Sequence, residues 1–292
     1  MLGSVEPARS DANSPERTMS HDQYFADNQA NWNDRVPIHA GPDGYNLQRY
    51  LEDPTRISEM VALDKRYLGD VSGRTLLHMQ CHIGTDTLSW ARLGADVTGI
   101  DFSAPALEVA RSLATDLGLD ARFVQSDVYD APDVLNEQFD IVYTGVGAIN
   151  WLPDIARWAQ VVASFTKPGG TFYMLEGHPV LWSLDHERTD GELVISEPYF
   201  ETTQPMTWEE DSTYLGTGTV EHATTHEWNH GLGEIVSALI GAGFRIELLD
   251  EHKTLYWLAL QHMIEEAEGH WVLPEQQRNL VPLMYSLKAT RT

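Results

Sequence analysis

The chain has 292 residues, 42% of them hydrophobic, which is enough to bury a substantial core in one domain with insertions or in two domains. Its 19 basic and 44 acidic residues give a formal net charge of −25. A surface of that sign repels nucleic-acid backbones and anionic membranes. We therefore expect a small-molecule substrate that is neutral, cationic or aromatic, with no nucleic-acid or membrane partner, and we leave an oligomer open.

The single cysteine, Cys81, excludes an intramolecular disulfide framework and suits a reducing compartment. Residues 1–20 are polar and rich in Ser, Pro and Ala, without the apolar stretch of a signal peptide. We expect a disordered tail over these residues. No apolar run reaches the length of a membrane span, so the expected location is the cytoplasm.

Residues 21–70 read as an N-terminal helical cap, and residues 71–176 alternate strand and helix patterns. Predicted strands in the second segment cover 75–79, 97–100, 121–124, 139–144 and 171–176. Predicted helices cover 86–93, 103–118, 132–136 and 153–166, and a turn covers 167–170. Strands that alternate with helices predict a Rossmann-like α/β core, a parallel sheet with helices on both faces.

The pattern changes over residues 177–230, which are rich in Thr and β-branched residues and predict an antiparallel β insertion over the sheet. Residues 231–292 return to the α/β pattern, with a helix at 231–242, a strand at 244–249 and a final strand at 282–289. The stretch 252–281 carries mixed helix signals and allows no firm assignment.

The most informative segment is TLLHMQCHIGTDTLSWARLGADVTGID, residues 75–101. It reads as strand, glycine-bearing loop, helix and strand, with Asp101 at the tip of the second strand. Backbone N–H groups of such a loop and a carboxylate on the next strand together make a nucleoside site. A dinucleotide dehydrogenase needs G-x-G-x-x-G in this loop. The chain has a single glycine, Gly84, among those positions, so a ligand without phosphates, such as an adenosyl amino acid, fits better than a nicotinamide dinucleotide.

Later motifs agree, with Ser126 and Asp127 ending the third strand and a Pro-Gly-Gly turn before the fifth. In this order of motifs the chain resembles the class I S-adenosylmethionine-dependent methyltransferases, over about 75–176, 231–249 and 282–289. It is similar in particular to a bacterial small-molecule subgroup with a first motif of the type LLHLQCHxGxDTLSWA, here residues 76–91. That subgroup also carries the pattern WLPD…KPGG-x-FY, here residues 151–173.

The resemblance implies a sheet whose last strand is antiparallel and a cofactor, S-adenosyl-L-methionine, in the cofactor-binding core. It places the cofactor against Gln80, Cys81 and Gly84 (methionine loop), Asp101 (ribose), Phe102, Asp127 and Val128 (adenine), and Thr144 and Gly145 (fourth motif). Three residues depart from the usual motif, since His78 replaces an acid and Gln80 and His82 replace glycines. Simpler interpretations stay open, because Asp101 fits a solvated strand-end acid, Asp127 a turn former and Cys81 a packed core residue.

The acceptor is expected over the carboxyl ends of the strands, beneath the helical cap, the loop at 150–151 and the insertion. His178, which follows the fifth strand, is the first candidate for a general base, since an imidazole titrates near neutral pH. A structural imidazole is the alternative. Tyr24 is a second catalytic candidate, and His39 and Asp185 are weaker ones. The aromatic residues of the insertion suit an apolar acceptor or a small core of their own.

A metal site was considered at His222, His226 and His230, with Glu221 or Glu227. The Thr-rich context favours a strand, on which side chains four residues apart lie ~13 Å from each other, too far to share one ion. We expect no metal.

Two functions of different classes follow. The first is an S-adenosylmethionine-dependent methyltransferase that moves a methyl group to an O, N or C nucleophile by in-line displacement. The alternative is a non-catalytic module of the same fold that binds an adenosyl ligand or a protein partner. The altered glycine loop favours the alternative, and Asp101 and Asp127 favour the enzyme.

Overall fold

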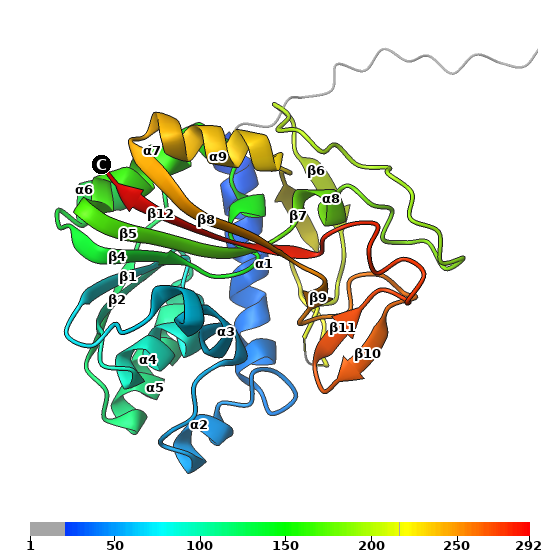
Figure 1. The fold of residues 1–292 in the computed structure, drawn as a ribbon. Coiled ribbons are helices and arrows are strands. Elements are labelled where there is room, and N and C mark those ends of the chain that lie inside the picture. Colours follow the sequence, from blue (N-terminus) through cyan, green and yellow to red (C-terminus); the bar gives the residue numbers. More distant parts are fainter. Residues whose placement is uncertain (1–20, 216) are drawn as a thin grey trace, which may run out of the picture.

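The computed structural model describes residues 21–215 and 217–292, so the expected tail over 1–20 lies outside the described residues. A seven-stranded sheet with the order β3-β2-β1-β4-β5-β12-β8 forms the centre (Figure 1). Its strands are β1 (Thr75–Met79), β2 (Asp96–Asp101), β3 (Ala121–Gln125), β4 (Phe139–Thr144), β5 (Thr166–Gly177), β8 (Phe244–His252) and β12 (Met284–Arg291). Pairings among β1 to β5 are parallel, and β12 is antiparallel to both β5 and β8. The predicted Rossmann-like sheet with an antiparallel last strand is confirmed.

Helices cover both faces of this sheet (Figure 1). One face packs on α6 (Ala131–Val134), α7 (Ile155–Phe165) and α9 (Leu232–Gly241), around a core that includes Trp158 and Phe172. The other face packs on α3 (Glu59–Leu68), α4 (Thr85–Arg92) and α5 (Ala104–Leu117). None of the helices among the described residues is both long and apolar enough to cross a membrane.

Helix ends follow the local sequence signals. The Ser103 hydroxyl accepts a hydrogen bond from the backbone N–H of Ala106 and begins α5, as its predicted cap position requires. Gly118, with a φ of 64°, ends the same helix in the left-handed conformation that glycine tolerates. Asp154 caps α7 by accepting from the N–H of Arg157.

The segments outside the core hold the 20-residue helix α1 (His21–Ala40). Their shorter elements are α2 (Gln48–Glu52), the 3₁₀ helix η1 (Ile149–Trp151), α8 (Pro179–Trp182) and the strands β6 (Met206–Glu209), β7 (Thr224–Glu227), β9 (Thr254–Leu255), β10 (Ile264–Ala267) and β11 (His270–Val272). The insertion is less β-rich than predicted, since its described residues, 177–215 and 217–230, add one bridge between Leu184 and Ile195 to the β6–β7 pair. The mixed helix signals over 252–281 were misleading, because β9, β10 and β11 form a small antiparallel sheet there. The predicted turn at 167–170 lies inside β5, next to a register shift against β4.

Helix α1 lies between the main sheet and the insertion (Figure 1). The Asn28 side chain exchanges two hydrogen bonds with the backbone of His226 in β7, and Asn31 donates to the carbonyl of His222. On its other side, Gln29 donates to the carbonyl of Phe102, just after β2. The N-terminal helix and the insertion therefore cover together the end of the sheet where β1, β2, β4 and β5 terminate.

Candidate functional site

The loop after β1 has a left-handed backbone at three positions, Gln80 (φ 56°), His82 (φ 48°) and Gly84 (φ 77°). A Cβ atom at Gly84 would lie 2.8 Å from the Cβ of Ala110, so only glycine fits there. For Gln80 and His82 this conformation costs roughly 1–2 kcal/mol each. The loop thus keeps the backbone of a glycine-rich loop while carrying two large polar side chains, and strain of this kind is typical of functional sites.

Asp101, at the tip of β2, is joined to this loop. Its Oδ2 accepts a hydrogen bond from the N–H of His82 at 2.8 Å, and its Oδ1 accepts from the N–H of Ser103 at 2.9 Å. Burial raises the pKa of Asp101 to about 6, although the backbone hydrogen bonds oppose the shift. A carboxylate with two oxygens has room for further donors beside these two. The side chain is therefore positioned to accept hydrogen bonds from a diol.

Gln80 connects the loop to the segment after β4. Its Nε2 donates to the carbonyl of Ala148 at 2.8 Å, which leaves Oε1 buried and without a hydrogen-bond partner among the described residues. The segment itself is held by Glu176, a buried carboxylate at the end of β5. Glu176 accepts from the backbone N–H groups of Gly147 (2.7 Å), Ala148 (2.6 Å) and Ile149 (3.0 Å). Sequence reasoning missed Glu176, although an acid that ends a strand was a visible signal.

The other predicted cofactor residues lie around the same strand ends. Thr144 and Gly145 follow directly at the end of β4, and the Thr144 hydroxyl is buried without a partner among the described residues. Asp127 accepts from the N–H of Tyr129 at 2.7 Å, as a turn former does, and burial raises its pKa. Val128 is buried in the core.

Comparisons with known proteins agree with this geometry. Residues 76–170 match the model of a methyltransferase domain family. This segment, which runs from β1 into β5, is similar to a methyltransferase domain. A ubiquinone biosynthesis O-methyltransferase from Alkalilimnicola ehrlichii is 37% identical over 103 residues, which are 35% of this chain and 41% of that protein. The chain therefore spans about two fifths of the length of the curated relatives it matches.

Solved structures show the same fold. A Listeria monocytogenes protein assigned as an S-adenosylmethionine-dependent methyltransferase aligns with a TM-score of 0.57 at 18% identity, over 80% of this chain and 96% of that one. The complex of DhpI with SAH aligns with a TM-score of 0.54 at 16% identity, over 92% of this chain and 98% of that one. At these identities the likeness concerns the fold alone.

In the loop after β1, Cys81 is a packed residue. Its side chain is buried beside Leu88 and Phe123, and its N–H donates to the carbonyl of Ile100. Burial raises the pKa of its thiol well above the usual value, which disfavours the thiolate. The structure therefore favours the interpretation of Cys81 as a packed core residue, whose backbone is part of the loop and whose sulfur points into the core.

The ring of His178 lies between the start of α8 and the carboxylate of Glu251. Its Nδ1 accepts from the N–H of Val180 at 3.1 Å, so the ring proton is on Nε2, which lies 3.0 Å from Oε1 of Glu251. This arrangement favours the structural alternative for His178. Tyr24 donates to Oε1 of Gln204 at 3.0 Å, and its ring packs 4.6 Å from that of His226. Neither side chain is free in this structure to take a proton from an acceptor.

The two weaker catalytic candidates, Asp185 and His39, lie in different surroundings. Asp185 accepts from the N–H of Glu187 in a local turn. His39, in contrast, lies over the loop after β1, where its Nδ1 is 2.9 Å from Nε2 of His82 and its Nε2 is 2.8 Å from the hydroxyl of Thr213. Burial lowers the pKa of His39 to about 4, so the ring is neutral at neutral pH and connects α1, the loop and the insertion.

His39 belongs to an aromatic cluster that sequence reasoning resolved only in part. The ring of Trp32 lies 5.1 Å from that of His82 and 5.4 Å from that of Trp151. The guanidinium of Arg35 stacks against both tryptophans, 4.9 Å from Trp32 and 5.6 Å from Trp151. This cluster connects α1, the loop after β1 and the segment after β4.

The three histidines considered for a metal have separate partners. His222 pairs with Asp34, His226 with Asp27, and His230 with Glu201. Across residues 21–215 and 217–292 no group of three or more potential ligands has the geometry to hold a metal ion. Of the three, only His226 lies in β7, and His222 and His230 flank that strand.

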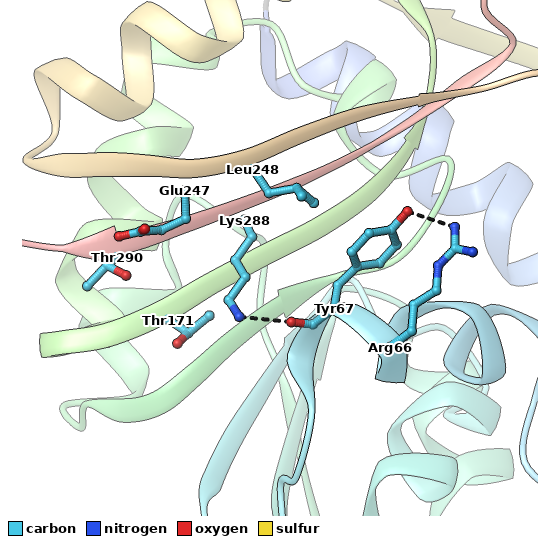
Figure 2. A pocket seen from close by; sticks show the side chains of 7 residues that line it. All are labelled: Arg66, Tyr67, Thr171, Glu247, Leu248, Lys288 and Thr290. Carbon is cyan, nitrogen blue, oxygen red and sulfur yellow. Dashed lines mark hydrogen bonds between the residues drawn. The ribbon is translucent and has the colours of Figure 1, made fainter.

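A cavity of about 550 Å³ lies away from the strand ends described above. Figure 2 shows it as an open groove on the face of β5, β8 and β12, beside the end of α3. Its basic groups already have partners, since Lys288 donates to the carbonyl of Tyr67 and Arg66 to the hydroxyl of Tyr67. None of the predicted site residues lines this groove.

Proposed function

We propose that the chain is an S-adenosylmethionine-dependent methyltransferase that acts on a small-molecule nucleophile. The observation that carries the proposal is the connection between the left-handed loop after β1 and the buried Asp101, through the N–H of His82. The match of residues 76–170 to a methyltransferase domain supports it. Relatives named O-methyltransferases favour oxygen among the possible O, N and C acceptors.

The residues present fit an adenosyl amino acid. Asp101 would accept hydrogen bonds from the two ribose hydroxyls with the lone pairs that His82 and Ser103 leave free. The buried and unpartnered Oε1 of Gln80 would accept from the ammonium group of the methionine moiety. Gly84 would bring backbone close to this moiety, and Phe102, Asp127 and Val128 would flank the adenine. When bound, the cofactor supplies a methyl group already activated on a sulfonium.

The protein's own contribution is alignment and exclusion of water. Glu176 holds the backbone after β4 in place, beside Thr144 and Gly145. This backbone would border the space in which the methyl donor and the acceptor substrate meet. The aromatic cluster of Trp32, His39, His82 and Trp151, which Tyr45 joins through its contact with His39, would cover this space. Holding two reactants in line and out of water is the main rate contribution when the leaving group is already activated.

Calorimetric titration with S-adenosylmethionine, S-adenosylhomocysteine and NAD tests the proposal. We expect micromolar binding of the two adenosyl ligands and none of NAD. Asp101→Ala should weaken adenosyl binding by about 2 kcal/mol or more, since charge-assisted hydrogen bonds are lost. Asp96→Ala is the matched control, because Asp96 is exposed at the opposite end of the same strand. No adenosyl binding by the wild type would overturn the proposal, and binding without transfer to any acceptor would favour the non-catalytic module.

A further inference from the structure

A small cavity lies where the segments after β4 and β5 meet the end of β7. It is lined in part by Ile149, Asn150, Pro179, Trp182, Trp228 and His230. Its volume of about 10 Å³ admits one group of the size of a water molecule. The cavity is therefore at the end of the sheet where the proposed methyl acceptor must lie.

Three residues that line this cavity each have a buried polar atom with no hydrogen-bond partner among the described residues. The atoms are Oδ1 of Asn150, an acceptor, Nε1 of Trp228, a donor, and Nδ1 of His230, which lies 2.9 Å from Oε2 of Glu201 in an ion pair. Asn150 and Trp228 have no such charged neighbour at these atoms, and both are almost fully buried, with exposed fractions of 9% and 1%. A buried polar group without a partner costs about 1–3 kcal/mol, so an acceptor and a donor that border one cavity call for a ligand.

The neighbours of Asn150 fix which end of its amide is left free. Its Nδ2 donates to Oε2 of Glu227 at 3.0 Å, which directs Oδ1 away from that carboxylate. Its backbone carbonyl accepts from the N–H of Trp228 at 2.8 Å, which holds the two residues side by side. His230 donates from Nε2 to the carbonyls of Ile149 (3.1 Å) and Leu152 (2.8 Å) and fixes the rest of η1. The acceptor and the donor are therefore held in place before any ligand arrives.

A hydroxyl group matches this pair, because it donates one hydrogen bond and accepts another. An ammonium group would leave the Trp228 N–H unpaired, and a carboxylate would face Oδ1 of Asn150 with a like charge density. Among the remaining lining residues, the polar Asn229 and His230 donate to backbone carbonyls. The others, which include Ile149, Pro179 and Trp182, are apolar and suit a hydroxyl carried by an apolar or aromatic scaffold.

We propose that Asn150 and Trp228 form a specificity subsite for a hydroxyl group of the acceptor substrate, with Glu227 as the residue that positions Asn150. This inference rests on the proposed function, since it places the subsite beside the methyl donor. It adds a substrate class, a hydroxylated and largely apolar small molecule. It also assigns a role to Glu227, whose Oε2 accepts the hydrogen bond from Asn150.

The test is nuclear magnetic resonance of the ¹⁵N-labelled full chain, with phenol and toluene as probes in the presence of S-adenosylhomocysteine. Trp228→Phe identifies the indole N–H signal of Trp228 by its absence. We expect this signal to move saturably with phenol and to stay in place with toluene at the same concentration. Asn150→Leu should lower the affinity for phenol about fivefold or more, the equivalent of one lost hydrogen bond.

Trp158 supplies the matched control. Its Nε1 is also buried without a partner among the described residues, but Trp158 is on the core-facing side of α7 and does not line this cavity. The chemical shift of its indole N–H signal should stay constant with phenol and with toluene. Trp158→Phe should leave the affinity for phenol unchanged. This variant separates the loss of a donor at the subsite from the loss of any buried indole N–H.

Equal shifts with phenol and toluene would overturn the proposal and leave an apolar pocket. No shift with either probe would also overturn it and leave a cavity that holds one structural water. Should either variant fail to fold, the comparison of phenol with toluene on the wild type still decides. Titration of the same sample with S-adenosylhomocysteine alone reports separately on the proposed function, because that binding needs neither Asn150 nor Trp228.

Discussion

Gln80 and Glu176 bind the two backbone groups of Ala148, one from each side. Gln80 donates to the carbonyl oxygen at 2.8 Å, and Glu176 accepts from the N–H at 2.6 Å. The loop after β1, the segment after β4 and the end of β5 are thereby joined through a single residue. Movement of any one of the three would break a buried hydrogen bond, so the candidate site behaves as one rigid unit.

Replacing Glu176 with Gln should destabilise the protein by about 3 kcal/mol or more. The carboxylate is 1% exposed and accepts from four backbone N–H groups, those of Gly147, Ala148, Ile149 and Gly177. An amide would turn N–H donors toward these donors and leave them unpaired. Urea unfolding measures the change, and Glu247→Gln on the exposed side of β8 should stay within about 0.5 kcal/mol. Similar values for the two variants would contradict the anchoring role.

The left-handed backbone at Gln80 should favour glycine over alanine at this position. Both Gln80→Ala and Gln80→Gly lose the bond to Ala148, but glycine also relieves the strain of φ 56°. The glycine variant should therefore be the more stable of the two by about 1 kcal/mol. At Gln125, in β3, the order should reverse, since glycine weakens an extended strand. Thermal or urea unfolding of the four variants gives the comparison, and the same order at both sites would refute it.

The structural role of His178 has a simple test by substitution. His178→Ala should cost about 1 kcal/mol, because the N–H of Val180 loses its capping partner at the start of α8. His178→Asn should recover most of this stability, since asparagine also caps helices well. If His178 were the general base, neither variant would retain turnover. Retained turnover in His178→Asn, with a pH–rate profile like that of the wild type, would assign the residue to structure.

Asp64 should make the stability of the protein depend on pH. It is fully buried in α3 and accepts from the hydroxyls of Tyr143 (2.8 Å) and Tyr173 (2.6 Å). Burial outweighs these bonds and raises its pKa to about 7. Between the unfolded value near 4 and this value the folded state binds more protons, so stability falls as pH rises through that window.

The size of the effect can be measured against a neutral variant. From pH 5 to pH 8 the wild type should lose roughly 3 kcal/mol of unfolding free energy at Asp64, and Asp64→Asn should lose none at this position. The free energy of urea unfolding at the two pH values, for both proteins, checks this. Parallel pH profiles would mean that Asp64 is ionised in the folded state throughout.

The sequence by itself determined the alternation of strands and helices, the antiparallel last strand implied by the resemblance, and the position of Asp101 at the tip of β2. These features depend on local signals, which are hydrophobic period, turn residues and caps such as Ser103. The short strands over 252–281 escaped prediction because two to four residues are too few to establish a period.

Only the tertiary structure decided the partners of the polar side chains. The bonds of Glu176 to the segment after β4, of His39 to His82 and of Asn150 to Glu227 join residues 27 to 77 positions apart. No local pattern specifies such pairs, because they arise when loops from different strands meet at one end of the sheet. The sequence therefore predicted where a site lies, and the fold determined which of its acids and imidazoles are anchors and which groups remain free to bind a ligand.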